Sequence, residues 1–200
     1  MRVRRLIPIA VLAVAASAHA QSDRAPRETV TAQVNGKKVA VEYGRPSLKG
    51  RTVKDLLAQL PANRVWRAGV DQATTLTTES DVLIGGKRVP AGKYTLYLHA
   101  PTSGTYELLV NRDLGVPLKS IYAAAPAAVA DALWPHIEDY PSIKDKEVAR
   151  IPLKSGAAHS GAADRFLIGL TPAVDGVSGI TLSWGDQSWT TDIRAASPAK

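Results

Sequence analysis

TVTAQVNGKKVAVEY, residues 29–43, is the stretch that decides the fold. Both halves alternate apolar and polar residues, as strands with one buried face do. Between them stands Asn35-Gly36, a pair that accepts the positive φ angles of a two-residue hairpin turn. The stretch therefore predicts a β-hairpin with strands over 29–34 and 37–43.

The same pattern recurs along the chain, with turn residues between short β-prone runs. The other predicted strands cover residues 73–78, 82–84, 87–89, 93–99, 105–111, 146–153, 165–170, 179–184 and 188–194. Short strands at such spacing are typical of a β-sandwich or jelly roll rather than a βαβ fold. We therefore predict an all-β, antiparallel, jelly-roll-like sandwich. We also expect one or two short helices, for which residues 52–60 are the clearest candidate.

One segment, residues 114–142, departs from this pattern because it holds four prolines and an alanine-rich piece. Residues 123–133 predict a short helix begun by Pro126. A connection this long is either a functional loop or a disordered one. Trp134, Ile137 and Tyr140 favour a packed loop.

The N-terminus predicts export. Arg2, Arg4 and Arg5 precede an apolar run over 6–18, and Ala18-His19-Ala20 fits a small-x-small cleavage site, which is the layout of a signal peptide. The run is too short for a membrane span of about 20 residues. We expect residues 1–20 to be removed, giving a periplasmic or secreted protein without stable membrane insertion. Residues 21–194 then form one domain, followed by a disordered tail over 195–200.

Composition narrows the classes of function. The chain has no cysteine, which excludes disulfides, thiolate metal sites and a lipid anchor on cysteine. Its 25 Lys+Arg and 18 Asp+Glu give a net charge of +7. The predicted signal peptide carries three of the arginines, so the mature chain is near +4. That charge weakly favours anionic partners. We expect no nucleic acid partner, because no long basic run or recognised binding motif occurs.

Two blocks hold the candidate binding residues: Tyr43-Gly44-Arg45-Pro46-Ser47 and residues 65–74, VWRAGVDQAT. Each places an arginine beside an aromatic ring, with glycine or proline shaping the backbone. Arginine supplies a rigid fork of donors for carboxylate or phosphate. Turns are also where binding residues concentrate.

These blocks, together with Gly50-Arg51 and residues 90–94, PAGKY, resemble the bacterial family called domain of unknown function 2911. The resemblance covers approximately residues 30–111 closely and the C-terminal strands loosely. It implies an exported, β-rich protein and no settled activity. The chain departs from the family where Asp71-Gln72 replaces the usual Asn-Glu pair, which moves the carboxylate by one position.

The candidate binding residues admit two interpretations. In the first, Arg45, Arg51 and Arg67 converge on an anionic group. Tyr43 and Trp66 offer a flat wall, and Asp71 orients Arg67. In the second, the same arginines pair with Asp71, Glu42 or Asp55 and pin loops, while Trp66 is core.

Other kinds of site have weaker support in the sequence. Residues 44–52 resemble a phosphate-binding loop, but the glycine spacing is one residue too long and Arg51 stands where lysine is required. His99, His136 and His159 have no metal-ligand spacing, so we expect no metal and no cofactor. Trp184 and Trp189 flank a hairpin turn, where we expect them to be core. Paired carboxylates for glycoside hydrolysis would be Asp71 with Glu42 or Glu107.

From the sequence we therefore expect a binding module for a glycan, an anionic small molecule or an envelope protein. The alternatives are a carbohydrate-active hydrolase or isomerase and a structural protein of the cell envelope. Fold alone does not decide among these classes.

Overall fold

The computed structural model describes residues 25–158 and 163–197. The predicted signal peptide, His159 and the last three residues of the predicted tail lie outside the described residues. No helix in the described ranges is long and apolar enough to cross a membrane.

The predicted hairpin of residues 29–43 is confirmed and begins the larger of two sheets. Strand β1 (Arg27–Val34) pairs with β2 (Lys37–Gly44) across the turn. Asn35 and Gly36 adopt φ angles of 50° and 71°, the left-handed values that this turn requires. Val39, Val41 and Tyr43 face the core, while the alternate residues of β2 lie on the other face.

The two sheets are antiparallel throughout the described strand pairs. The first sheet has the order β1-β2-β4-β7-β8-β11, with β3 beside β7. Its other strands are β3 (Val65–Trp66), β4 (Thr75–Thr78), β7 (Gly92–His99), β8 (Glu107–Asn111) and β11 (Glu147–Pro152). The second sheet has the order β13-β14-β15-β5-β6, with β12 beside β15. Its strands are β5 (Val82–Ile84), β6 (Lys87–Val89), β12 (Lys154–Ala157), β13 (Ala163–Leu170), β14 (Val177–Gly185) and β15 (Gln187–Ala195).

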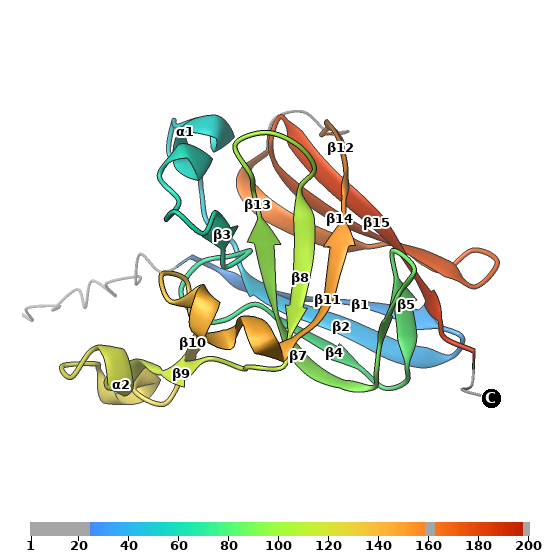
Figure 1. The fold of residues 1–200 in the computed structure, drawn as a ribbon, viewed down its shortest axis with the longest axis horizontal. Helices are drawn as coiled ribbons and strands as arrows, with labels where there is room; N and C mark the ends of the chain where they lie inside the picture. The colour runs from blue at the N-terminus through green and yellow to red at the C-terminus, as the bar shows by residue number, and fades with distance from the viewer. Residues whose placement is uncertain (1–24, 159–162, 198–200) are drawn as a thin grey trace, which may run out of the picture.

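The sheets pack against each other, so the prediction of an all-β antiparallel sandwich is confirmed (Figure 1). Its jelly-roll character stays a prediction. One hydrophobic core joins side chains of both sheets, among them Leu76 and Leu98 of the first and Phe166 and Leu182 of the second. Trp184 and Trp189 are both buried, as predicted. Across the strands, Trp189 is opposite Leu182 and Trp184 is opposite Gln187.

Helix α1 (Val53–Ala58) confirms the short helix predicted between residues 52 and 60. Thr52 caps it: its hydroxyl accepts from the Asp55 N–H at 3.1 Å, which satisfies one of the free donors at a helix start. Val53 and Leu57 turn into the core. At the other end of the chain, the Ala196 N–H donates to the Asp81 carbonyl at 3.0 Å, so pairing continues beyond the predicted start of the tail.

Residues 116–134 form an arm that extends from the sandwich at lower left in Figure 1. Strand β9 (Val116–Pro117) pairs with β10 (Leu133–Trp134), and between them lie helix α2 (Leu118–Ile121) and a single 3₁₀ turn, η1 (Ala127–Val129). The helix predicted over 123–133 is therefore wrong except for this turn, which does follow Pro126. The pairing of residues 133–134 with β9 holds the end of the segment extended.

Beyond the arm, a second 3₁₀ helix, η2 (Tyr140–Lys146), covers the outer face of the first sheet. Tyr140 and Ile143 pack there against Val65, Tyr97 and Leu109 in a separate small core. The prediction that the 114–142 connection packs against the protein is thus confirmed at Tyr140.

Candidate functional site

The two arginine-containing blocks lie against each other, and their glycines make this contact possible. A Cβ atom on Gly44 would overlap the Val70 carbonyl oxygen, and one on Gly69 would overlap the Thr74 hydroxyl. That hydroxyl donates to the Ala68 carbonyl at 2.9 Å and closes the segment on itself. The end of β2 and the turn of residues 68–74 therefore form one tightly packed unit.

The two aromatic rings of the blocks belong to the core. Tyr43 is fully buried and its hydroxyl lies 3.2 Å from the Ile168 carbonyl, to which it donates. Trp66 stacks on Trp184 at 5.0 Å between ring centroids and meets Phe166 edge-on at 4.8 Å. The structure thus places Tyr43 and Trp66 between the sheets and not as an open wall for a ligand.

The three arginines nominated from the sequence point to different places. Arg45 forms an ion pair with Glu28 at 3.0 Å and donates to the Phe166 carbonyl. Exposed Arg51 donates to the Leu48 carbonyl at 3.0 Å, near α1. Arg67 donates to the Asp71 carbonyl at 3.2 Å. The structure brings Arg67 and Asp71 together, as predicted, but through the backbone oxygen of Asp71.

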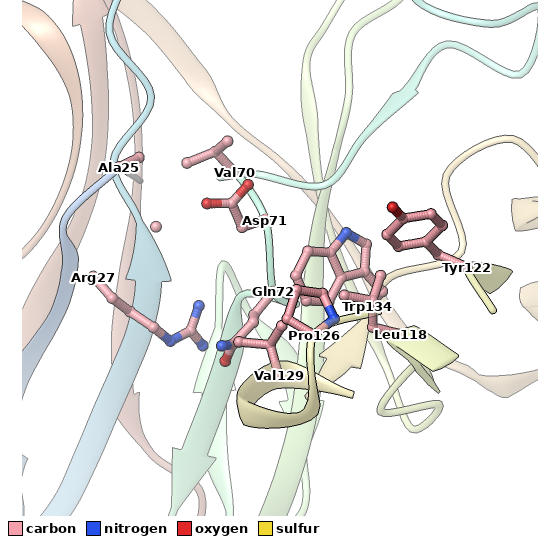
Figure 2. Close-up of a pocket in the computed structure, with 11 residues that line it drawn as sticks. Ala25, Arg27, Val70, Asp71, Gln72, Leu118, Tyr122, Pro126, Val129 and Trp134 are labelled. Atoms are coloured by element: carbon pink, nitrogen blue, oxygen red, sulfur yellow. The ribbon is translucent and has the colours of Figure 1, made fainter. Parts of the chain in front are cut away.

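Asp71 lines a cleft of about 410 Å³ between the packed unit and the arm, which we name the first cleft (Figure 2). One side comes from the start of β1 and the segment of residues 70–72. The other side comes from α2, η1 and β10. The lining residues are Ala25, Arg27, Gly44, Val70, Asp71, Gln72, Leu118, Tyr122, Pro126, Val129 and Trp134.

The polar side of the first cleft holds Arg27, Asp71 and Gln72. Arg27 is tied down by an ion pair with Glu42 at 2.6 Å and a hydrogen bond to the Ala73 carbonyl at 2.9 Å. Its Nη1 atom is buried and has no hydrogen-bond partner within the described chain. A buried donor without a partner costs free energy, and this donor of Arg27 is left unused by the described part of the protein.

The aromatic side of the first cleft comes from the arm. Figure 2 shows the rings of Trp134 and Tyr122 across the cleft from Arg27 and Asp71. Tyr122 is 54% exposed, whereas Trp134 is half-buried. The arm is seated by a hydrogen bond from the Ala73 N–H to the Leu133 carbonyl at 2.9 Å, beside the segment that carries Asp71.

The backbone of the motif is strained at two residues, and one of them, Asp71, lines the cleft. Ala68 and Asp71 have φ angles of 49° and 60°, values that cost free energy for residues with a Cβ atom. Such residues gather at functional sites more than elsewhere. The packing of Gly44 and Gly69 holds this conformation in place.

A second cleft, of about 460 Å³, lies on the Arg67 side of Trp134. It is lined by Arg67, Val116, Ile121, Trp134, Pro135, His136, Ile137, Glu138 and Asp139. The two clefts share Trp134. Beneath the second cleft, the buried Tyr97 hydroxyl accepts from the His136 N–H at 3.3 Å, and burial raises the pKa of Tyr97.

A larger cleft, of about 720 Å³, lies beside α1 and is lined by Lys54, Arg64, Tyr106 and Asp186 among others. Lys54 and Asp186 are exposed, and the first turn of α1 is already satisfied by its own capping residues. The first cleft is the stronger candidate because Val70, Asp71 and Gln72 of the motif block line it.

The other candidate groups serve structural contacts. His99 lies 3.0 Å from Glu107, and Glu107 also binds Arg150 at 2.8 Å on the outer face of the first sheet. Glu107 is therefore part of another cluster than Asp71, and Glu42 is the partner of Arg27. In residues 25–158 and 163–197, no group of three or more histidine and acidic side chains could hold a metal ion.

The sequence did not identify Arg27, Gln72, Tyr122 and Trp134 as site residues. Nothing in the sequence marks Arg27 as a site residue, because it precedes the predicted hairpin and belongs to neither block. Trp134 and Tyr122 did carry a signal in the sequence, because they are large aromatic residues in a long proline-containing connection. Gln72 lay inside the quoted block but was considered only for the carboxylate that it lacks.

Comparison with known proteins places the chain by family alone. No curated protein and no solved structure matches it. A family model described as a protein of unknown function (DUF2911) matches residues 25–193. The match covers both sheets, the arm and both clefts, and it agrees with the resemblance carried by the two blocks. The chain therefore belongs to the DUF2911 family.

Proposed function

We propose that the protein is an exported binding protein that holds a small polyhydroxylated ligand, such as a glycan end, in the first cleft. One observation carries the proposal. Arg27, Asp71 and Gln72 line one side of the first cleft, and Trp134 and Tyr122 line the other. Ligand sites commonly combine an apolar wall with a few convergent polar groups.

The polar groups suit neighbouring hydroxyls. The Asp71 carboxylate only accepts hydrogen bonds, the Arg27 guanidinium only donates them, and the Gln72 amide does both. A sugar hydroxyl donates and accepts, so two adjacent hydroxyls satisfy the three side chains together. No hydrogen bond or ion pair engages the Asp71 carboxylate within the described ranges, so its oxygens are available to such donors.

The aromatic side suits the other face of such a ligand. A pyranose ring presents C–H bonds above and below its plane, and these pack on the flat apolar surface of a Trp or Tyr ring. The cleft volume of about 410 Å³ falls within the usual range for small-molecule sites.

Binding is tested by a thermal-shift screen of the mature chain against neutral sugars, uronic acids and amino sugars. We expect a sugar to raise the melting temperature of the wild type, because it binds the folded state alone. Asp71→Asn should lose most of this shift. Asp192→Asn, which changes an exposed carboxylate on β15, should keep it. Trp134→Leu should weaken binding as well, through the aromatic side.

Two results would contradict the proposal. One is a panel in which no sugar changes the melting temperature of the wild type. The other is a sugar whose effect is the same in Asp71→Asn and in the wild type, which would place its site elsewhere.

Export is the second part of the proposal and has its own test. It rests on the three arginines, the apolar run and the Ala18-His19-Ala20 site of the N-terminus. When the full chain is expressed in a Gram-negative host, we expect it in the periplasmic fraction, with an intact mass that begins at Gln21. A cytoplasmic protein that keeps residues 1–20 would contradict export and leave the sugar test unaffected.

A further inference from the structure

Arg67 and Arg64 are the half-buried arginines of the described residues that form no ion pair; Arg64 donates to the Ala100 carbonyl at 3.0 Å, and Arg67 lines the second cleft. Arg27, Arg45 and Arg150 each form an ion pair with glutamate, at distances of 2.6–3.0 Å. Arg67 has no carboxylate within 4.0 Å among the described residues, and its one hydrogen bond goes to the Asp71 carbonyl. Burial lowers the pKa of Arg67, and the charge of Asp71 opposes this shift only in part. A desolvated cation of this kind favours an anionic partner.

The second cleft gives that partner room. Val116, Ile121 and Trp134 provide an apolar wall next to Arg67, and Ile121 is 60% exposed. A large exposed aliphatic side chain beside a cleft is a surface that a ligand can cover. The cleft therefore combines one cation with an apolar wall.

The rim of the second cleft restricts the charge of the ligand. Glu138 and Asp139 line it and are exposed. They repel an anion, and the repulsion doubles for a doubly charged group such as phosphate. One arginine next to two acids thus suits a singly charged group. A planar carboxylate also matches the donor fork of a guanidinium.

We propose that the second cleft binds the carboxylate of a small apolar acid, with its oxygens on Arg67 and its apolar part on Ile121 and Trp134. His136 borders the same space. Its Nε2 atom lies 3.5 Å from the Asp113 carboxylate, and its backbone N–H is held by Tyr97. This site shares Trp134 with the proposed sugar site but uses Arg67 in place of Arg27, Asp71 and Gln72.

The test is a titration of ¹⁵N-labelled mature protein with phenylacetate, followed by the indole N–H signals of its tryptophans. The Trp134 signal is identified by its absence in Trp134→Phe. We expect phenylacetate to shift the Trp134 signal, and 2-phenylethanol, which has the same ring and no charge, to bind at least tenfold more weakly. Inorganic phosphate should also bind at least tenfold more weakly than phenylacetate.

Variants then identify the cation. Arg67→Gln should weaken phenylacetate binding at least tenfold, whereas Arg51→Gln, which changes an exposed arginine near α1, should leave it unchanged. The melting temperature of each variant checks its folding. Should Arg67→Gln fail to fold, Ile121→Ala takes its place: it alters the exposed apolar wall of the second cleft and should weaken phenylacetate binding, whereas unchanged binding would overturn the proposal.

Three further results would overturn the proposal: no shift of the Trp134 signal with phenylacetate, equal binding of phenylacetate and 2-phenylethanol, or phosphate binding as tightly as phenylacetate. None of these results bears on the Asp71→Asn test of the first cleft, so failure of the two proposals can be told apart.

Discussion

At the scale of single residues, the two blocks owe most of their character to packing. Gly44 admits the Val70 carbonyl, and Trp66 fills the space beside Phe166. Arg45 joins the end of β2 to β1 through Glu28 and to β13 through the Phe166 carbonyl. The packing of these residues sets the position of Asp71 and Arg67. A change in the packing residues should therefore alter stability, and a change in the lining residues should alter binding.

Gly44→Ala tests this packing. The added methyl group would overlap the Val70 carbonyl, and overpacking of this kind costs about 1–3 kcal/mol in the free energy of unfolding. Gly169→Ala is the matched control, because a Cβ atom there meets nothing closer than the Thr181 oxygen at 4.0 Å. Urea denaturation measures both variants. Equal stabilities of the two variants would refute the packing role of Gly44.

Asp113→Asn tests an acid-dependent contribution to stability. Burial raises the pKa of Asp113, but hydrogen bonds from Lys146 and from the Gly115 N–H, with the nearby charges of Lys146 and His136, outweigh it, so the pKa is lowered from 3.8. A carboxyl group whose pKa is lowered by folding contributes its full stabilisation above its unfolded-state pKa. That stabilisation is lost as the pH falls through its folded-state pKa.

Asp113→Asn should therefore have a lower free energy of unfolding than the wild type at pH 7. The expected difference is about 1–3 kcal/mol, because a charge-assisted hydrogen bond is lost. The difference in melting temperature should stay constant down to about pH 5 and shrink below about pH 4. Thermal unfolding followed by circular dichroism at several pH values measures it. A difference that persists unchanged at about pH 3 would show that the charge of Asp113 is not the cause.

At the scale of elements, the arm of residues 116–134 builds one side of both clefts while contributing little to the sandwich core. It is seated by the β9–β10 pairing, by the Ala73–Leu133 hydrogen bond and by Gly115. Gly115 has a φ of 96° and passes so close to the Trp134 carbonyl that a Cβ atom would overlap it. The geometry of both clefts therefore depends on this contact.

Gly115→Ala should loosen the arm and leave the sandwich intact. We expect amide hydrogen exchange to accelerate at least tenfold within residues 116–134 and to stay unchanged in β7 and β8, because local opening is independent of global unfolding. Gly104→Ala is the control: its φ of 100° carries similar strain, but nothing lies within 4 Å of its Cβ position. Exchange that accelerates equally with Gly104→Ala would assign the effect to strain alone.

At the scale of the whole molecule, the two sheets share one core and should unfold together. Phe166 of the second sheet contacts Tyr43 and Trp66 of the first and Trp184 of its own. Removing it should therefore destabilise both sheets at once. The cost expected for Phe166→Ala is about 3–5 kcal/mol.

The measurement is thermal unfolding followed by both tryptophan fluorescence and far-ultraviolet circular dichroism. We expect the two transitions to coincide in the wild type, as in a two-state domain, and to move together in Phe166→Ala. Replacing the exposed Val174 with alanine is the control. Transitions that separate would mean that the sheets unfold independently.

By itself, the sequence determined most of the local structure of the two sheets. Asn35-Gly36 specifies a tight hairpin, and both residues adopt the positive φ angles that such a turn needs. The alternating strands specify a sandwich, and Thr52 with Pro61 brackets the short helix. These features follow from the steric limits and hydrogen-bonding groups of neighbouring residues, so a pattern a few residues long suffices to predict them.

Only the tertiary structure decided which polar and aromatic residues meet at a surface. Tyr43 is buried against Ile168, 125 positions further along the chain, and Arg27 faces Trp134 across the first cleft. The helix predicted over 123–133 is reduced to the turn η1 after Pro126, and its predicted end pairs with β9 as β10. Burial and convergence depend on contacts between distant segments, which the local pattern does not contain, so the candidate site appeared only once both sheets and the arm were in place.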